Sequence, residues 1–283
     1  MNYKELPNIT EKQKEIIDLV YKFRFINRKQ VQKILNHKDP KRINTWLKDL
    51  VEKKYLGRIY SHKLLENTKP AIYYLNNNGV LWIRFNKGFE LGVEDLEFKY
   101  VKKFYEDKHA SEIFINHCVF ISDLYIQVKE LEKNKKNLEY SYLTKTELWT
   151  EYQIYGGIED LREFLPDVYM EKELETEKRI DTASFFLELF DSHVPRYALR
   201  YKIKKYIEFY ESDVWKHKFK SSDKSFPRIL LILSNQQKMN SLAKYIQKQL
   251  EETYNSENMT FELTTYEKIQ VEGLRNKNIW EIV

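Results

Sequence analysis

Residues 27–60 read NRKQVQKILNHKDPKRINTWLKDLVEKKYLGRIY, which contains two short amphipathic helical patterns separated by Asp39-Pro40 and followed by an extended stretch. Asn27 and Gln30 have the spacing of a capping box, in which each side chain bonds the backbone of the other residue, so a helix should begin here. Asp39 is suited to cap a second helix whose first position holds Pro40, where a missing N–H is harmless. We therefore expect two consecutive helices with a sharp break between them.

The flanking segments extend this pattern on both sides. Before it, Thr10 and Gln13 repeat the capping-box spacing in front of an amphipathic stretch, which predicts a first helix. After it, residues 55–63 and 69–79 read as two strands joined by a polar tip. Three helices followed by a hairpin are typical of a winged helix-turn-helix, and we expect this fold over residues 1–87.

The helix after Pro40 should have two chemically different faces. Apolar residues recur every three or four positions and should face the core: Ile43, Trp46, Leu47, Leu50 and Val51. The opposite face then carries Lys41, Arg42, Asn44, Thr45 and Lys48. Arginine and asparagine can make paired bonds to guanine and adenine edges, and lysine and threonine suit phosphates. This pattern favours a DNA-recognition helix, and an ordinary solvated helix face is the alternative.

Positive charge is concentrated at the N-terminal end of the chain. The net charge is +5, yet residues 1–90 hold 19 Lys/Arg against 9 Asp/Glu, which leaves 29 against 34 in the rest. Such a segment attracts a polyanion at long range. The side chains expected at phosphates, in the preceding helix and the hairpin, are Arg28, Lys29, His62, Lys63 and Lys69. Double-stranded DNA is the expected partner, and a winged helix that binds protein is the alternative.

Other features exclude several classes of protein. Cys118 is the single cysteine, so an internal disulfide is excluded, and the six histidines lack metal-ligand spacing. The longest apolar run, residues 229–234, is too short to cross a bilayer, and the N-terminus does not read as a signal peptide. We expect a cytoplasmic protein without a membrane partner, a structural metal or a cofactor.

Residues 88–138 read as a helical connector. An apolar stripe with alternating steps of four and three residues runs through it, as in a seam between helices: His117, Ile121, Leu124, Val128 and Leu131. Such a stripe usually packs inside one chain, with the histidine as a hydrogen-bonded packing residue. A homodimer seam is the sharper hypothesis, because winged-helix proteins often bind paired half-sites.

The remaining residues, 139–283, alternate between strand and helix patterns. Strands are expected within 163–171, 183–190, 227–235 and 260–267, and helices over 196–212 and 236–252. This order is typical of an α/β domain with a crossover helix. The paired glycines Gly156 and Gly157 lack the lysine and the spacing of a nucleotide-binding loop.

Two acidic residues at strand positions could form a metal site. Asp167 stands at the start of one expected strand and Glu188 lies in the next, so both could bind Mg²⁺. This arrangement resembles the PD-(D/E)xK nuclease-like core, which usually has a lysine two residues after the glutamate, where Phe190 stands here. Lys202 or Lys204 could substitute, but nothing in the sequence aims either at the site. We expect a non-catalytic scaffold, and a metal-dependent DNA nuclease is the alternative.

Several stretches together resemble one family. They are INTWLKDLVEKKYLGRIY, YYLNNNGV, LPDVYM, FFLELFDSHVPRYALRYKIKKYIEFY, FPRILLILSN and the late IW. The chain resembles, over nearly its whole length, the replication-relaxation proteins of bacterial plasmids and integrative elements. The resemblance implies a DNA-binding protein needed for plasmid replication and DNA relaxation, and it transfers no catalytic residues.

The sequence therefore predicts a sequence-directed double-stranded DNA-binding protein that acts at an origin or transfer locus of a mobile element. Its expected architecture is α+β: an N-terminal winged helix-turn-helix, a helical connector and a C-terminal α/β domain resembling a restriction-endonuclease-like core. The C-terminal half would recruit replication or transfer proteins. A winged-helix transcriptional regulator is the nearest alternative, with the same DNA chemistry and an output set by where it binds.

Overall fold

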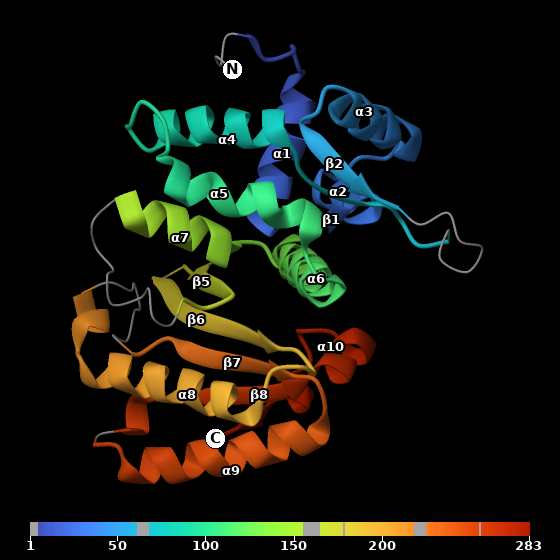
Figure 1. Cartoon of the computed structure of the whole chain (residues 1–283). Coiled ribbons are helices and arrows are strands. Elements are labelled where there is room, and N and C mark those ends of the chain that lie inside the picture. The colour runs from blue at the N-terminus through green and yellow to red at the C-terminus, as the bar shows by residue number, and fades with distance from the viewer. Residues whose placement is uncertain (1–4, 61–67, 155–164, 178, 218–224, 255) are drawn as a thin grey trace. The chain divides into compact units, whose positions relative to one another are not determined.

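The computed structural model describes residues 5–60, 68–154, 165–177, 179–217, 225–254 and 256–283. The chain is a mixed α+β protein and divides into two compact units, and most of their elements are labelled in Figure 1. Unit 1 comprises Met1–Ile126 and Trp149–Tyr155, and unit 2 comprises Gln127–Leu148 and Gly156–Val283. Helix α6, Glu112–Asn134, therefore begins in unit 1 and ends in unit 2.

Unit 1 opens with a small helical and sheet assembly. Its first elements are α1 (Glu11–Phe23), β1 (Ile26–Asn27), α2 (Arg28–Ile34), α3 (Pro40–Glu52), β2 (Leu56–Ile59) and β3 (Ile72–Leu75). The strands form an antiparallel sheet in the order β1-β3-β2. The three predicted helices and two predicted strands are confirmed, and β1 is an additional strand that sequence reasoning missed. The helices α4 (Asn77–Glu90), α5 (Phe98–Glu106) and the first part of α6 follow.

Side-chain caps explain where the first two helices begin. Gln13 N donates to Thr10 Oγ1 at 3.4 Å, and Thr10 N donates to Gln13 Oε1 at 2.9 Å. Asn27 and Gln30 form the same reciprocal pair, at 3.1 and 2.9 Å. Both predicted capping boxes are confirmed. Gln30 Nε2 also donates to Val119 O at 2.8 Å, which ties α2 to α6.

The core under these helices is apolar and closely packed. Ile16 of α1 is fully buried, as are Ile43 and Leu47 of α3. Burial of such side chains contributes about 1.5–3 kcal/mol each, which holds α3 with its opposite face outward. At the start of α4, Gly79 leaves no room for a side chain, because a Cβ there would lie 2.1 Å from the carbonyl oxygen of Tyr55.

Unit 2 is built on a six-stranded mixed sheet in the order β4-β5-β6-β7-β8-β9. The strands are β4 (Leu138–Thr144), β5 (Val168–Glu175), β6 (Ile180–Phe190), β7 (Arg228–Leu233), β8 (Phe261–Thr265) and β9 (Glu281–Ile282). β5 is antiparallel to both neighbours, β6, β7 and β8 are parallel, and β9 is antiparallel to β8. The four predicted strands are confirmed, whereas β4 and β9 were not predicted.

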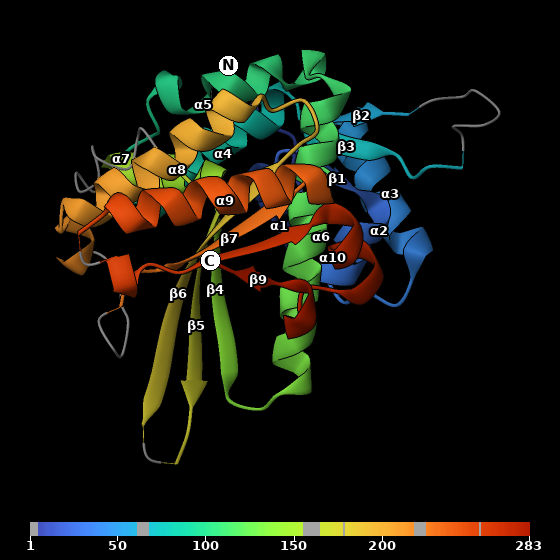
Figure 2. The ribbon, with the colours of Figure 1, turned by 90° about the horizontal axis from the view of Figure 1, so that it is seen from below.

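Helices supply the crossovers that parallel strands require. α8 (Arg196–Glu211) connects β6 to β7, and α9 (Gln236–Glu252) connects β7 to β8. Both were predicted, and Figure 2 shows them lying side by side. α7 (Lys145–Ile154) follows β4 directly and α10 (Tyr266–Glu272) follows β8.

The predicted stripe of α6 is already covered inside the chain. Ile121, Leu124 and Val128 are buried and His117 is half-buried, its ring stacked at 6.5 Å on Phe114. This burial favours packing within one chain, while a homodimer stays a prediction. Within the described ranges, no helix is both long and apolar enough to cross a bilayer.

Candidate functional site

The start of α3 is set by a side-chain cap. Asp39 Oδ1 accepts a hydrogen bond from Lys41 N at 2.8 Å, and Pro40 occupies the first helical position, as predicted. Asp39 N in turn donates to the Nδ1 of His37 at 3.2 Å, which orders the residues before the helix. The cap fixes where the first turn lies and hence which residues face outward.

The outward face of α3 is basic and polar along its first half. All five residues predicted there are exposed: Lys41, Arg42, Asn44, Thr45 and Lys48. Lys48 Nζ lies 3.7 Å from Glu52 on the same helix. Lys41 and Arg42 form no ion pair with any residue that the structure describes, so their charges are available to a polyanion.

Two of these side chains are already oriented by neighbours. The Arg42 guanidinium lies 5.6 Å from the ring centre of Trp46, and that ring meets His37 edge-on at 5.1 Å. Thr45 Oγ1 donates to Lys41 O at 3.1 Å, so its hydroxyl is used within the helix. The Asn44 amide has no hydrogen-bond partner among the described side chains and backbone groups, which leaves it able to bond a base edge.

The structure describes only some of the other residues that were predicted to contact DNA. Lys29 at the start of α2 and Lys69 before β3 are exposed, and Arg28 is half-buried. His62 and Lys63 lie outside the described residues, so their placement is not part of the site.

Arg58 adds a cation that sequence reasoning missed. It is exposed on β2, directly opposite Tyr73 of β3. Burial raises the pKa of Tyr73, while the positive charges of Arg58 and Arg28 oppose that rise, so both guanidinium groups lie near this ring. The sequence signal that could have identified Arg58 is its position on the strand that leads into the predicted wing. Arg58 on β2 thus adds a cation to Arg28, the first residue of α2.

A second cluster lies in unit 2 where β5 and β6 meet. The register pairs Val168 with Leu187, so Asp167 lies across from Glu188, and residues directly opposite in an antiparallel pair share one face. Asp167 Oδ2 accepts a hydrogen bond from Leu189 N at 2.9 Å. The two carboxylates weighed from the sequence are therefore brought together.

A lysine from α8 reaches this cluster. Lys202 Nζ lies 3.0 Å from Glu188 Oε1 and donates to Leu165 O at 2.8 Å. Of the two lysines that the sequence offered as possible substitutes, Lys202 therefore lies at the carboxylates, whereas Lys204 is exposed. The reason is the crossover, which lays α8 across the end of β6.

The surroundings of Glu188 are closed and polar. Its side chain is 4 % exposed, and the Tyr206 hydroxyl donates to the same Oε1 atom. Burial raises the pKa of Glu188, the Lys202 charge lowers it and the Asp167 charge adds to the rise. Lys145 Nζ lies 3.7 Å from Asp167 Oδ1 and is 55 % exposed. Two carboxylates and two lysines thus converge from four separate segments.

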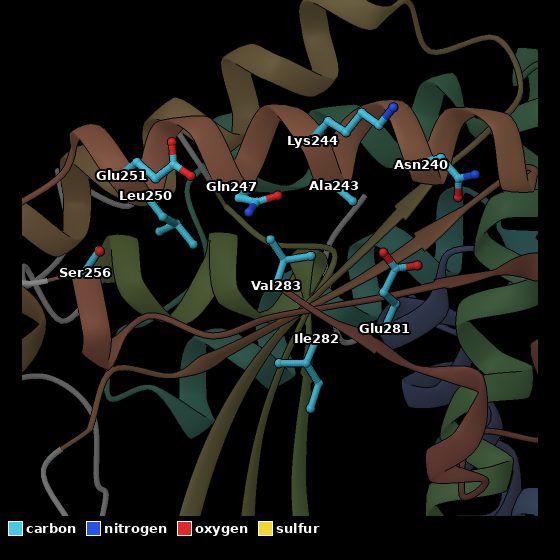
Figure 3. A pocket seen from close by; sticks show the side chains of 10 residues that line it. All are labelled: Asn240, Ala243, Lys244, Gln247, Leu250, Glu251, Ser256, Glu281, Ile282 and Val283. Atoms are coloured by element: carbon cyan, nitrogen blue, oxygen red, sulfur yellow. The ribbon is translucent and has the colours of Figure 1, made fainter.

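Another hollow of unit 2 lies between α9 and the last residues of the chain (Figure 3). Asn240, Lys244 and Gln247 line it from α9, and Glu281 and Val283 line it from the other side. These side chains mix one lysine with amides and an acid. In the described part of the chain, no group of three or more His, Cys, Asp or Glu side chains is placed to hold a metal ion.

Comparison with family models gives a match to replication-relaxation over residues 17–224, which is more than half of the chain. The chain belongs to the replication-relaxation family. The resemblance found in its sequence is thereby confirmed. No curated protein and no solved structure matches the chain.

The matched region of this replication-relaxation protein contains both candidate sites. It includes α3 and also Asp167, Glu188 and Lys202, and it ends before β7. Sequence reasoning found the carboxylates and named Lys202 beside Lys204, but it missed Tyr206 and could not choose between the two lysines. The spacing of four residues between Lys202 and Tyr206 places them on one helix face beside the buried stripe of α8, which is the pattern that could have suggested both.

Proposed function

We propose that this protein binds double-stranded DNA through the exposed face of α3, at an origin or transfer locus of a mobile element. The observation that carries the proposal is the chemistry of that face, on a helix whose other face is anchored in the core. Among the described residues, Lys41 and Arg42 have no ion-pair partner and the Asn44 amide has no hydrogen-bond partner. These are the side chains that bond phosphates and the major-groove edges of guanine and adenine.

The arrangement of neighbouring elements supports a winged helix-turn-helix. Helix, strand, helix, helix and a two-stranded antiparallel pair follow one another in unit 1, and α3 packs against both α2 and β2. In such proteins the third helix enters the major groove, and the strands beside it contact the backbone. Lys29, Arg58 and Lys69 would then supply phosphate contacts. Family membership supports a role in plasmid replication or relaxation.

The proposal predicts two classes of variant with different behaviour. Arg42→Ala and Asn44→Ala should each cost about 1–3 kcal/mol on the preferred duplex and little on random DNA, because base contacts carry discrimination. Lys29→Ala and Lys69→Ala should weaken binding to every duplex and make the salt dependence shallower by about one unit per lost contact.

The measurement is fluorescence anisotropy on a selected site and on a scrambled duplex, at several salt concentrations. Lys99→Ala is the matched control, because Lys99 is an exposed lysine of unit 1 on α5 and pairs with Glu97. Unchanged duplex binding in both classes would show that α3 is not the DNA-binding element. A footprint of bound sites at promoters instead of an origin would favour the regulator alternative.

A further inference from the structure

We propose that the outward face of α8 binds single-stranded DNA, separately from the duplex-binding face of α3. This basic-aromatic face consists of exposed residues of one helix: Arg196, Tyr197, Arg200, Tyr201 and Lys204. The choice of DNA over RNA rests on the proposed function of α3, whereas the strand-binding surface itself rests on residues of unit 2 alone.

Helical spacing places these residues on one side of α8. The cations recur at every fourth position, and each tyrosine follows a cation by one position, so cations and rings form two adjacent rows. Leu199, Ile203 and Tyr206 are buried and hold the opposite side of the helix in the core. Successive cations are about 6 Å apart along the helix axis. Such a row suits the repeated phosphates of a polynucleotide, whereas a single small anion needs cations that converge on one point.

The cations of the basic-aromatic face have no acidic partner in the described part of the chain. Arg196, Arg200 and Lys204 form no ion pair with any residue that the structure describes. The Arg200 guanidinium lies 5.0 Å from the centre of the Tyr245 ring of α9, which positions this side chain without neutralising it. The face therefore presents its full positive charge to an anion.

A crevice between α8 and α9, which lie side by side in Figure 2, extends this positive surface. Arg196 and Arg200 line it from α8 and Lys238 lines it from α9, and the described residues of its lining include no acid. Lys238 Nζ donates to Ser192 O at 2.7 Å and to Val194 O at 3.0 Å, so neutral groups hold the ammonium and its charge remains. A phosphate in this crevice would meet three cations and no carboxylate.

Helix stability does not explain the arginine at the start of α8. Arg196 is the first residue of the helix and the first turn contains no acid, although the helix dipole favours acidic side chains at this end. A cation here slightly destabilises the helix, and a bound phosphate would offset that effect. The position of Arg196 therefore favours a role in binding.

The exposed tyrosines indicate a single strand instead of a duplex. Tyr197 is 76 % exposed and Tyr201 is 57 % exposed. Unpaired bases stack on exposed aromatic rings, whereas the bases of a duplex already stack on one another and present only their edges in the grooves. Phosphates on the row of cations and bases on the adjacent rings account for both kinds of side chain.

The test measures binding of the full-length protein to a fluorescent single-stranded DNA oligonucleotide by anisotropy at several salt concentrations. The double variant Tyr197→Ala/Tyr201→Ala should lower the affinity at least about 10-fold, because two stacking platforms are lost. Tyr197→Phe/Tyr201→Phe keeps both rings and should stay within about twofold of the wild type. Arg196→Gln and Arg200→Gln should each make the salt dependence shallower by about 0.7 units, the value for one phosphate contact on a single strand.

Two other exposed side chains of unit 2 provide matched controls. Tyr254 is 83 % exposed, and Lys248 of α9 is an exposed lysine that lies 3.8 Å from Glu252. Both lie outside the basic-aromatic face, so Tyr254→Ala and Lys248→Gln should leave the affinity for the strand unchanged. Melting curves identify a temperature at which every variant is folded.

Duplex DNA and RNA of the same sequence complete the test. The tyrosine variants should leave duplex affinity unchanged and Arg42→Ala should leave single-strand affinity unchanged, so failure of the α3 proposal remains distinguishable. Unchanged single-strand affinity in the double alanine variant, or an equal loss in Tyr254→Ala, would overturn the proposal. An equal loss of duplex binding would contradict the single-strand assignment, and tighter binding of RNA than of DNA would overturn the choice of DNA.

Discussion

The two candidate sites handle positive charge in opposite ways. On α3 the cations stand in solvent: Lys41 and Arg42 have no ion-pair partner in the described residues, and Lys48 makes only a long contact to Glu52. In unit 2 Lys202 is mostly buried and bonded to Glu188. An exposed, unpaired cation contributes little to stability and much to binding a polyanion, whereas a buried pair is coupled to the fold itself.

The largest expected effect tests the buried side of this comparison. Lys202→Met leaves Glu188 enclosed without its counter-charge and should lower the free energy of unfolding by about 3–5 kcal/mol, measured by denaturant titration. Adding Glu188→Gln should restore part of that loss, because no uncompensated charge then remains. Lys48→Met is the matched control on an exposed pair and should change stability little. If Lys202→Met and Lys48→Met lower the free energy of unfolding equally, the buried pair is no more coupled to the fold than the exposed one.

Unit 1 also contains a buried ion pair. It can show whether burial alone, and not the unit in which a pair lies, couples a charge to the stability of the fold. The Asp107 side chain is fully enclosed and bonds Arg24. Burial raises the pKa of Asp107 from 3.8 to about 6, although the bond from Arg24 opposes the rise. The folded protein therefore binds a proton there more tightly than the unfolded chain, so this contribution to stability is complete below about pH 4 and is lost as pH rises through 6.

Asp107→Asn removes this titration and makes its sign measurable. The stability of the wild type relative to the variant should fall by about 1–3 kcal/mol between pH 4 and pH 7. Urea titrations of both proteins at four pH values provide the comparison. A difference that stays constant or rises with pH would contradict the raised pKa and would place Asp107 with the exposed charges.

The smallest expected effect concerns Asp39, which should influence both the stability of α3 and its affinity for DNA. Asp39→Ala removes the cap bond to Lys41 N and should lower the unfolding free energy by about 1 kcal/mol. The same change removes a negative charge beside the proposed phosphate contacts, so affinity for random duplex DNA should rise. Asp39→Asn keeps the cap and changes only the charge. Unchanged affinity in both variants would mean that this end of α3 faces away from DNA.

The sequence determined the local structure of the N-terminal half because the relevant interactions span few residues. Both capping boxes, the cap at Asp39 and the outward residues of α3 follow from spacings of two to eight positions, and helical periodicity alone assigns them to a face. The same periodicity placed α8 and α9. It did not find Arg58 or the short strand β1. A two-residue strand has no periodicity of its own and is recognised only by the strand with which it pairs.

Only the tertiary structure decided which side chains meet in unit 2. Asp167 and Glu188 are 21 positions apart and meet through the β5–β6 register, and Lys202 is delivered to them by a crossover whose direction the sequence does not encode locally. The sequence named the carboxylates and identified Phe190 as the missing cation position. Which lysine lies beside the carboxylates is decided by three-dimensional packing, because contacts between residues distant along the chain do not follow from local spacing.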